Sequence, residues 1–154
     1  MTDGRNLALA LLVFCFLGMK VAALLRADGN AKPLNITFDD IKLEMKKGGT
    51  FQRSMLTERI NKLAGKPVRI RGYILPSYQQ RGIVQFVLVR DNMECCFGPG
   101  AALYDCVLVE MQPGTSASYT VRPVAVTGVF SIHEIKGPDG KHLAIYHLAG
   151  QTVQ

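Results

Sequence analysis

The chain has 154 residues, of which 48% are hydrophobic and 19% charged, and its formal net charge is +6. This composition is too apolar for a disordered chain, and the length suits one domain plus a short additional segment. The 18 Lys and Arg side chains are spread through the chain and not gathered in one run. The positive charge therefore argues weakly for nucleic acid and suits an anionic membrane surface equally well.

The most apolar stretch lies near the N-terminus, where Leu7 to Leu25 reads LALALLVFCFLGMKVAALL and carries one charge. A bilayer core requires roughly 20 apolar residues, with about 17 as the lower limit, so this stretch is long enough to cross it. No clean small-x-small cleavage site follows, which favours a retained anchor over a cleaved signal peptide. We expect residues 1–26 to be a membrane anchor or signal segment, residues 27–36 a polar linker, and residues 37–154 the domain.

Two short helices are predicted at the start of the domain. Residues 37–47 read TFDDIKLEMKK, with start signals at Thr37 and Asp39, apolar side chains at helical spacing, and two glycines immediately after. Residues 56–64 form the second helix, with Thr57 as its N-cap residue and a glycine at its end. Both helices are expected to pack against the strands that follow.

From Pro67 onward the apolar period is that of strands, and five β-branched runs are separated by Gly, Pro, Asn or Asp. The runs are VRIRGYILP, IVQFVLVRD, YDCVLVEM, PVAVTGVFSI and LAIYHLAG. A Pro-Asp-Gly turn within residues 136–142 joins the last two. Five short strands in so small a domain predict a closed barrel, because closure removes exposed edges. The expected fold is mainly β: a small five-stranded barrel resembling the oligonucleotide/oligosaccharide-binding (OB) barrel, preceded by two short helices and an N-terminal transmembrane helix.

Three of the four cysteines lie close together, at Cys95, Cys96 and Cys106. An exported domain meets an oxidising compartment, so one disulfide between Cys106 and either Cys95 or Cys96 is the favoured interpretation. Buried unpaired thiols and a metal site are the alternatives, and His133 is the candidate fourth ligand of a zinc ion. Because the chelating Cys-x-x-Cys spacing is absent, we expect no cofactor, with zinc as the one alternative. Redox catalysis is disfavoured for the same reason.

The segments GKPVRIRGYILP and QFVLVRD, followed by a cysteine and FGPG, resemble a family of bacterial envelope proteins that is defined by a domain of unknown function. The resemblance extends from Thr37 to the C-terminus, and its most specific part is Gly-Tyr-Ile-Leu-Pro at residues 72–76. By position, the family cysteine is Cys95, Cys96 replaces an apolar residue, and Phe97 stands where members commonly have histidine. The resemblance implies a location in the envelope more than an activity, and the Phe97 departure weakens a metal site carried over from the family.

No sequence motif of catalysis is present, since Ser/His/Asp order, paired carboxylates, phosphate-binding glycines and dinucleotide fingerprints are all missing. We therefore do not expect an enzyme. The candidate histidines are interpreted as strand residues, except His142, which lies beside a turn and is expected to be solvated. The candidate ligand-facing side chains are Tyr73, Pro76, Tyr78 and Phe97.

A nucleic-acid-binding face is the weaker alternative for the exposed side of the strands. Basic and aromatic residues could form it together, but the same pattern fits a strand with a polar face in water. These residues are Arg69, Arg71, Tyr73, Tyr78 and Arg81.

The sequence predicts a membrane-anchored binding or accessory module of the bacterial envelope, with a single-pass anchor in the inner membrane and an extracytoplasmic domain. Its expected partners are the membrane and envelope transport proteins, within a transport or metal-handling assembly, and its ligand is not defined by the sequence. The alternative function is metal binding, zinc-like in type, by the Cys95, Cys96 and Cys106 cluster.

Overall fold

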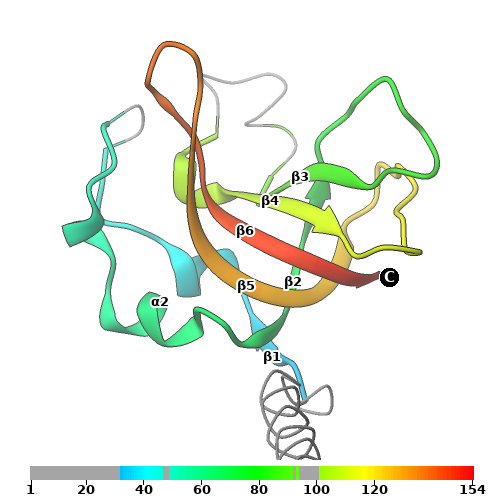
Figure 1. The fold of residues 1–154 in the computed structure, drawn as a ribbon, viewed down its shortest axis with the longest axis horizontal. Helices are drawn as coiled ribbons and strands as arrows, with labels where there is room; N and C mark the ends of the chain where they lie inside the picture. Colours follow the sequence, from blue (N-terminus) through cyan, green and yellow to red (C-terminus); the bar gives the residue numbers. More distant parts are fainter. Residues whose placement is uncertain (1–31, 47–48, 92, 94–100) are drawn as a thin grey trace, which may run out of the picture. The chain divides into compact units, whose positions relative to one another are not determined.

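The computed structural model describes residues 32–46, 49–91, 93 and 101–154, in which six strands form one sheet (Figure 1). The strands are β1 (Leu34–Ile36), β2 (Pro67–Ile74), β3 (Gln85–Val89), β4 (Cys106–Met111), β5 (Val124–Lys136) and β6 (His142–Val153). The short helical elements are η1 (Phe38–Ile41), η2 (Arg53–Met55), α2 (Glu58–Leu63) and η3 (Leu103–Asp105). The prediction of a mainly β domain with few helices is confirmed.

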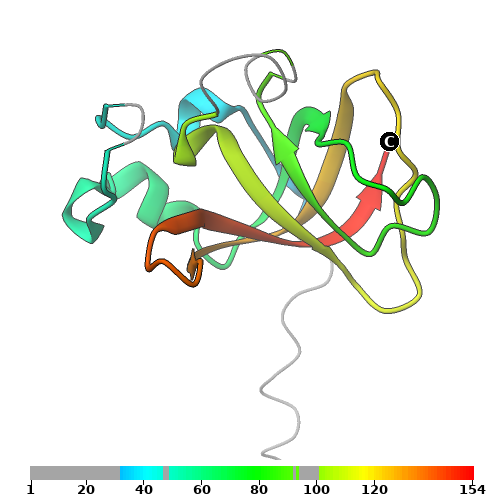
Figure 2. The same ribbon diagram turned by 90° about the horizontal axis from the view of Figure 1, so that it is seen from above.

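The strand order is β1-β2-β3-β4-β6-β5, and β2 also pairs with β5. The pairings therefore run from β2 through β3, β4, β6 and β5 and return to β2 (Figures 1 and 2). β4 and β6 are parallel, whereas β2–β3, β3–β4, β5–β6 and β2–β5 are antiparallel. Each strand of this circuit thus pairs with two neighbours, although β2 and β3 pair over two residues only.

All five predicted strands are present, and β1 is an additional strand that the sequence did not predict. It lies in the segment expected to be a linker, and it pairs in parallel with β2, with Ile36 opposite Ile70. Three residues are too few to show the alternation of a strand, and this one forms because pairing with β2 buries Ile36. The structured domain therefore begins before residue 37.

The helix predicted over residues 37–47 is wrong beyond its first turn. Phe38 and Ile41 are buried as expected, but the helical element ends at Ile41 and the backbone of Lys42 is extended. Residues 41–45 then alternate between apolar and polar, so that Leu43, 1% exposed, also enters the core. Burial of Leu43 outweighs the weak helical preference of the segment.

The second predicted helix is confirmed as α2. The Thr57 hydroxyl accepts a hydrogen bond from the Ile60 amide at 3.3 Å, which satisfies one of the free amides of the first turn. Ile60 and Leu63 face the core, and Gly65 follows with a φ of +78°. Glycine adopts this left-handed conformation without the steric cost that a side chain would add.

No helix among the described residues has the length and apolarity needed to cross a membrane. The predicted membrane segment, Leu7 to Leu25, lies outside the described residues, and the anchor therefore stays a prediction.

The core centres on Phe130 and Tyr146, whose ring centroids lie 5.3 Å apart. The Tyr146 side chain is fully buried, and its hydroxyl donates a 2.7 Å hydrogen bond to the Ile41 carbonyl, 105 residues earlier in the chain. Burial raises the pKa of Tyr146, so the phenol remains a donor. This bond fixes the end of η1 against β6.

Gly72 of β2 lies where two main chains approach closely. A Cβ atom built on this residue would lie 2.5 Å from the Val89 carbonyl oxygen and 3.0 Å from both the Leu88 and Phe38 side chains. The Val89 oxygen belongs to the main chain and cannot move aside independently. We expect Gly72→Val to lower the free energy of unfolding by about 3 kcal/mol, measured by chemical denaturation.

Arg71→Ser is the matched control for this substitution, because Arg71 is the adjacent residue but lies on the exposed face of β2. Its effect on the free energy of unfolding should stay within about 0.5 kcal/mol. Equal stability of the two variants would contradict the close approach at Gly72.

Tyr146→Phe should cost about 1 to 2 kcal/mol in unfolding free energy, because it removes a buried donor and leaves the Ile41 carbonyl without it. Tyr78→Phe, in a loop where the tyrosine is fully exposed, should leave the melting temperature unchanged. Thermal melts of the two variants would test this, and an unchanged melting temperature for Tyr146→Phe would contradict the bond.

Candidate functional site

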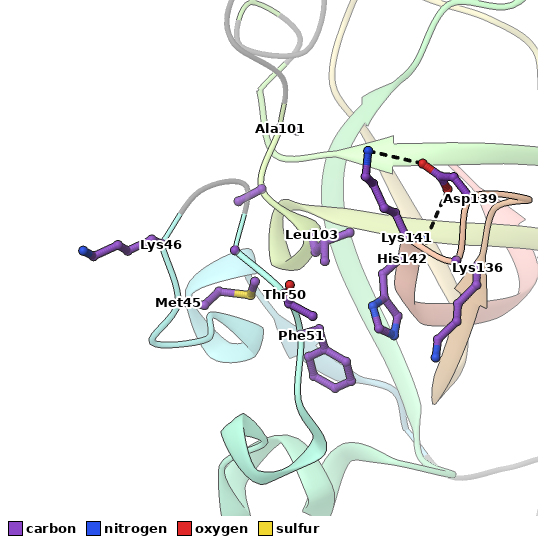
Figure 3. Close-up of a pocket in the computed structure, with 13 residues that line it drawn as sticks. Met45, Lys46, Thr50, Phe51, Ala101, Leu103, Lys136, Asp139, Lys141 and His142 are labelled. Carbon is purple, nitrogen blue, oxygen red and sulfur yellow. Dashed lines mark hydrogen bonds and ion pairs between the residues drawn. The ribbon is translucent and has the colours of Figure 1, made fainter.

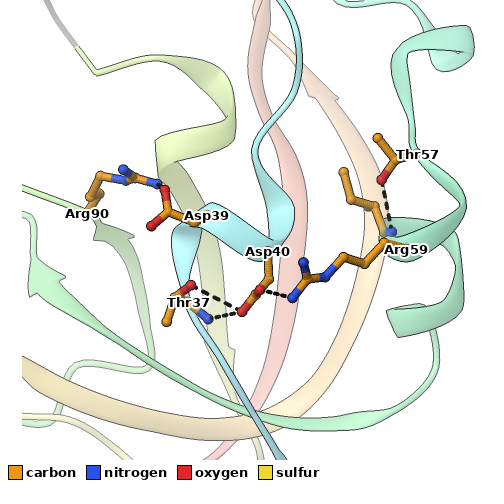
Figure 4. A network of polar contacts seen from close by, with 7 residues as sticks. Thr37, Asp39, Asp40, Thr57, Arg59 and Arg90 are labelled. Carbon is orange, nitrogen blue, oxygen red and sulfur yellow. Dashed lines mark hydrogen bonds and ion pairs between the residues drawn. The ribbon is translucent and has the colours of Figure 1, made fainter.

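A network of charged side chains joins η1 to α2, β3 and η3 (Figure 4). Arg90, which follows β3, donates to Asp39 at 2.6 Å and lies 2.8 Å from Asp105 of η3. Burial opposes the charge of Arg90, but the hydrogen bond to Asp39 and the charge of Asp105 outweigh it, so its pKa is raised. Arg59 of α2 pairs with Asp40 in the same way. The charges neutralise one another within the fold, and the network serves structure.

A pocket of about 630 Å³ lies beneath the β5–β6 hairpin (Figure 3). Its lining comes from residues 45–46 and 49–51, residues 101–103, and residues 136 and 139–142 of the hairpin. Buried Phe51 lies on one side of it, and the rim carries exposed lysines and Asp139. The volume is in the range of small-molecule pockets.

His142 holds the base of this hairpin in place. Its Nε2 lies 3.0 Å from Glu134, its ring meets Phe51 edge-on with centroids 5.4 Å apart, and its side chain is 9% exposed. The expectation that His142 is solvated is therefore wrong, because the turn folds back over Phe51. Hydrogen bonds from His142 and then Arg53 lower the pKa of Glu134, so the carboxylate stays ionised.

A second hollow, here named the outer groove, crosses the exposed face of the sheet from the end of β2 to the β5–β6 hairpin. Its volume is about 420 Å³. Val87 of β3 and Leu108 of β4 are cross-strand partners in its floor, and Leu143, 63% exposed, stands at its hairpin side. The remaining lining residues are mostly apolar as well: Leu75, Pro76, Ser77, Gln85, Phe86, Ile135 and Ala144. An apolar hollow on an otherwise polar face is the feature expected of a binding surface.

The candidate ligand-facing residues occupy different places. Pro76 lines the outer groove, and Tyr78 is fully exposed in the loop that follows. Tyr73 is half-buried on β2, opposite Val89. Phe97 lies outside the described residues.

Of the candidate metal and disulfide residues, the structure describes Cys106 and His133. Cys106 begins β4 and is partly buried, and His133 is exposed on β5. Cys95 and Cys96 lie outside the described residues. Within the part of the chain that the structure describes, no group of three or more His, Cys, Asp or Glu side chains could hold a metal ion. The zinc alternative thus gains no support, and the disulfide stays a prediction.

A polar row that the sequence analysis missed borders the outer groove. Ser131 lies 3.3 Å from His147 Nδ1, and Glu110 lies 3.4 Å from His147 Nε2. His147 is also the register partner of groove residue Leu108, and the His133 ring lies 6.1 Å from its own. Glu110 and His147 each lie between buried neighbours, whereas Ser131 and His133 do not, and only the pairing of β4, β6 and β5 brings the four residues together. With Glu110 two-thirds exposed, the row forms a polar border and no enclosed acid–base pair.

The fold and these surfaces define a mainly β domain with an apolar groove and a separate pocket. The family model of a protein of unknown function (DUF3299) matches residues 24–154, and the chain belongs to this family. Membership in a family with a domain of unknown function, predicted from the motifs around Gly72, is confirmed. None of the curated proteins is similar to the chain in sequence.

A solved structure of a DUF3299 family protein from Pseudomonas aeruginosa PAO1 has the same fold, with a TM-score of 0.59 and 16% sequence identity. The match covers 80% of this chain and 96% of that one. The related chain therefore consists almost wholly of the matching region. At this identity the likeness establishes the fold alone.

The state of the cysteines can be measured directly. If Cys106 pairs with Cys95 or Cys96, alkylation of the unfolded, unreduced chain with Cys15 replaced by serine should label one thiol, and prior reduction should raise this to three. The crosslink should stabilise the domain by about 2 to 3 kcal/mol, seen as a lower melting temperature after reduction.

Labelling of three thiols without reduction would contradict the disulfide. Stability that responds to a chelator and not to a reductant would instead favour the metal alternative, because metal binding by thiolates is coupled to folding.

Proposed function

We propose that this protein is a membrane-anchored binding or accessory module of the bacterial envelope and that the outer groove receives an apolar segment of an envelope transport protein. In this proposal Leu7 to Leu25 cross the inner membrane once, and the domain is extracytoplasmic. The proposal treats the circuit of five paired strands as an OB-like barrel. The order β2-β3-β4-β6-β5 with return to β2, and the parallel β4–β6 pair, support that interpretation.

The outer groove is the observation that carries the proposal. Its floor is made by regular strands, so its shape is set by the sheet and little order has to be gained on binding. Its lining is almost all carbon, with Ser77 and Gln85 as the polar exceptions. A surface of this kind favours burial of an apolar partner at roughly 25 cal/mol per Å² of area removed from water.

Binding is favoured over catalysis by what faces the groove. Its lining contains no histidine, cysteine, lysine, arginine or carboxylate among the described residues. His147 lies at the border, paired with Ser131 and with an exposed Glu110. Glu110 is 67% exposed, so this histidine and carboxylate do not form an enclosed acid–base pair.

No observation on the described residues favours the metal-binding alternative. The measurement of the cysteines described above decides it.

The anchor is tested by fractionation of the full chain from cell envelopes. We expect the protein to stay in the membrane pellet through alkaline carbonate extraction, because Leu7 to Leu25 satisfies the length and apolarity of one span. A soluble mature form that begins near Ala27 or Asp28 would contradict retention of the anchor.

The groove is tested by site-specific photo-crosslinking in intact cells. A crosslinker at position 143 should give a discrete adduct with an envelope transport protein, because Leu143 is 63% exposed at the groove. Leu143→Glu should weaken co-purification of that protein about tenfold or more, because a charge is placed against the apolar contact.

Position 121 provides the matched control, because Val121 is 72% exposed but lies outside the groove, in the loop before β5. A crosslinker there should give no such adduct, and Val121→Glu should leave co-purification unchanged. Equal adducts at both positions, or adducts at neither, would overturn the groove as the contact site.

A further inference from the structure

A hollow of about 420 Å³ lies at the other end of the sheet from the hairpin, between β1, the start of β5 and the exposed face of β2. Two arginines of β2, Arg69 and Arg71, line it together with Asn35 of β1 and Gln154. The two arginines are two residues apart on one strand, so both point to the same face, with Cα atoms about 6.6 Å from each other. Two guanidinium groups at this spacing can contact one anion between them.

No Asp or Glu side chain lines this hollow. Arg69 lies between Asn35 on β1 and Thr127 on β5, and Arg71 lies opposite Ala125. Arg69 donates to the Gln154 side chain at 3.1 Å, which uses one of its five N–H groups and orients the rest. Neither arginine has a carboxylate partner among the residues the structure describes.

Three other arginines among the described residues do have acidic partners. Arg53, Arg59 and Arg90 each pair with a carboxylate. Arg69 and Arg71 are therefore two positive charges side by side in a hollow whose lining has no acidic side chain. The geometry suits the oxygens of a phosphate ester, which arginine binds through paired N–H groups.

The position of the hollow in the chain indicates the source of that phosphate. Asn35 lies ten residues after Leu25, the end of the predicted membrane segment, and a fully extended chain of that length spans at most about 35 Å. A phosphate carried by the bilayer surface is therefore the source that the proposed anchor favours.

We propose that Arg69 and Arg71 bind the headgroup phosphate of an anionic phospholipid, with Asn35 and Gln154 as neutral hydrogen-bonding partners. This inference rests on the proposed function for the membrane anchor. Binding of this kind brings the β1 end of the domain to the bilayer surface. Thr127, beside Arg69, and Ile135, in the groove, are eight residues apart on β5, which is about 26 Å along a strand.

The test uses residues 32–154, which form a compact unit that contains the whole described core. The related solved chain consists almost wholly of the matching region. Without its anchor, this fragment should sediment with vesicles of phosphatidylcholine and phosphatidylglycerol and not with phosphatidylcholine alone. Arg69→Gln with Arg71→Gln should reduce the partition coefficient about tenfold or more, since each arginine near an anionic surface contributes substantially to binding. Raised salt should weaken binding of the original fragment.

The matched control removes the same charge elsewhere. Lys46→Gln with Lys136→Gln changes two exposed lysines at the hairpin pocket that have no ion pair among the described residues. This variant should keep most of the vesicle binding. An equal loss in both double variants would overturn the site and leave only an effect of net charge.

Two further arms separate the sources of phosphate. Saturable binding of soluble glycerol 3-phosphate at Arg69 and Arg71, without a gain on anionic vesicles, would assign a free phosphate ester and overturn the lipid assignment. Displacement of the fragment from vesicles by a single-stranded oligonucleotide, at a phosphate concentration much lower than that of the vesicles, would overturn the lipid assignment in favour of nucleic acid. Circular dichroism of each variant confirms that the fold is intact.

The experiments distinguish failure of the anchor proposal from failure of the arginine-site proposal. Carbonate extraction of the full chain tests the anchor, and the double arginine variant should remain in the membrane pellet because Leu7 to Leu25 is unchanged. If the unsubstituted fragment does not bind anionic vesicles while the full chain stays in the pellet, the lipid site is rejected and the proposed anchor is unaffected.

Discussion

The antiparallel pairing of β2 with β5 is the constraint on which the remaining structure depends. Pro67 to Gly72 pair with β5, and the next two residues pair with β3, so β2 passes from one partner to the other at Gly72. The pairing of β2 with both β3 and β5 completes the circuit β2-β3-β4-β6-β5. It requires the Val89 carbonyl to approach Gly72 closely, and Gly128 on β5 admits a similar approach by the Ala149 carbonyl. Glycine at these positions removes the side chain that would prevent closure.

The sequence predicted those parts of the fold that depend on local pattern. Alternation located five strands, and a threonine cap with a terminal glycine located α2. β1 was missed because its strand character comes from its partner: three residues gain order by pairing with β2 and burying Ile36. The helix at residues 37–47 failed because Leu43 is needed in the core, which only the assembled sheet can determine.

The candidate sites were less predictable because they are made by residues that are distant in sequence. Pro76 was predicted to be ligand-facing and lines the outer groove, but the groove also needs Val87 beside Leu108 and the hairpin residue Leu143. His142 was interpreted as solvated because the sequence shows a turn, and the sequence does not show Phe51 beneath it. Arg69 and Arg71 were visible as a polar strand face. Their neutral neighbours, which decide the chemistry of the hollow, follow only from the register of β1 and β5.

The central position of β6 has a consequence for the order of events during synthesis. β6 is the last strand in the chain, yet it lies between β4 and β5 and supplies Tyr146 and Leu148 to the core. A nascent chain that lacks it has β4 and β5 without their shared neighbour and the Ile41 carbonyl without its donor. Folding rates fall as contacts become more distant in sequence. The domain therefore completes its core only after β6 has emerged from the ribosome.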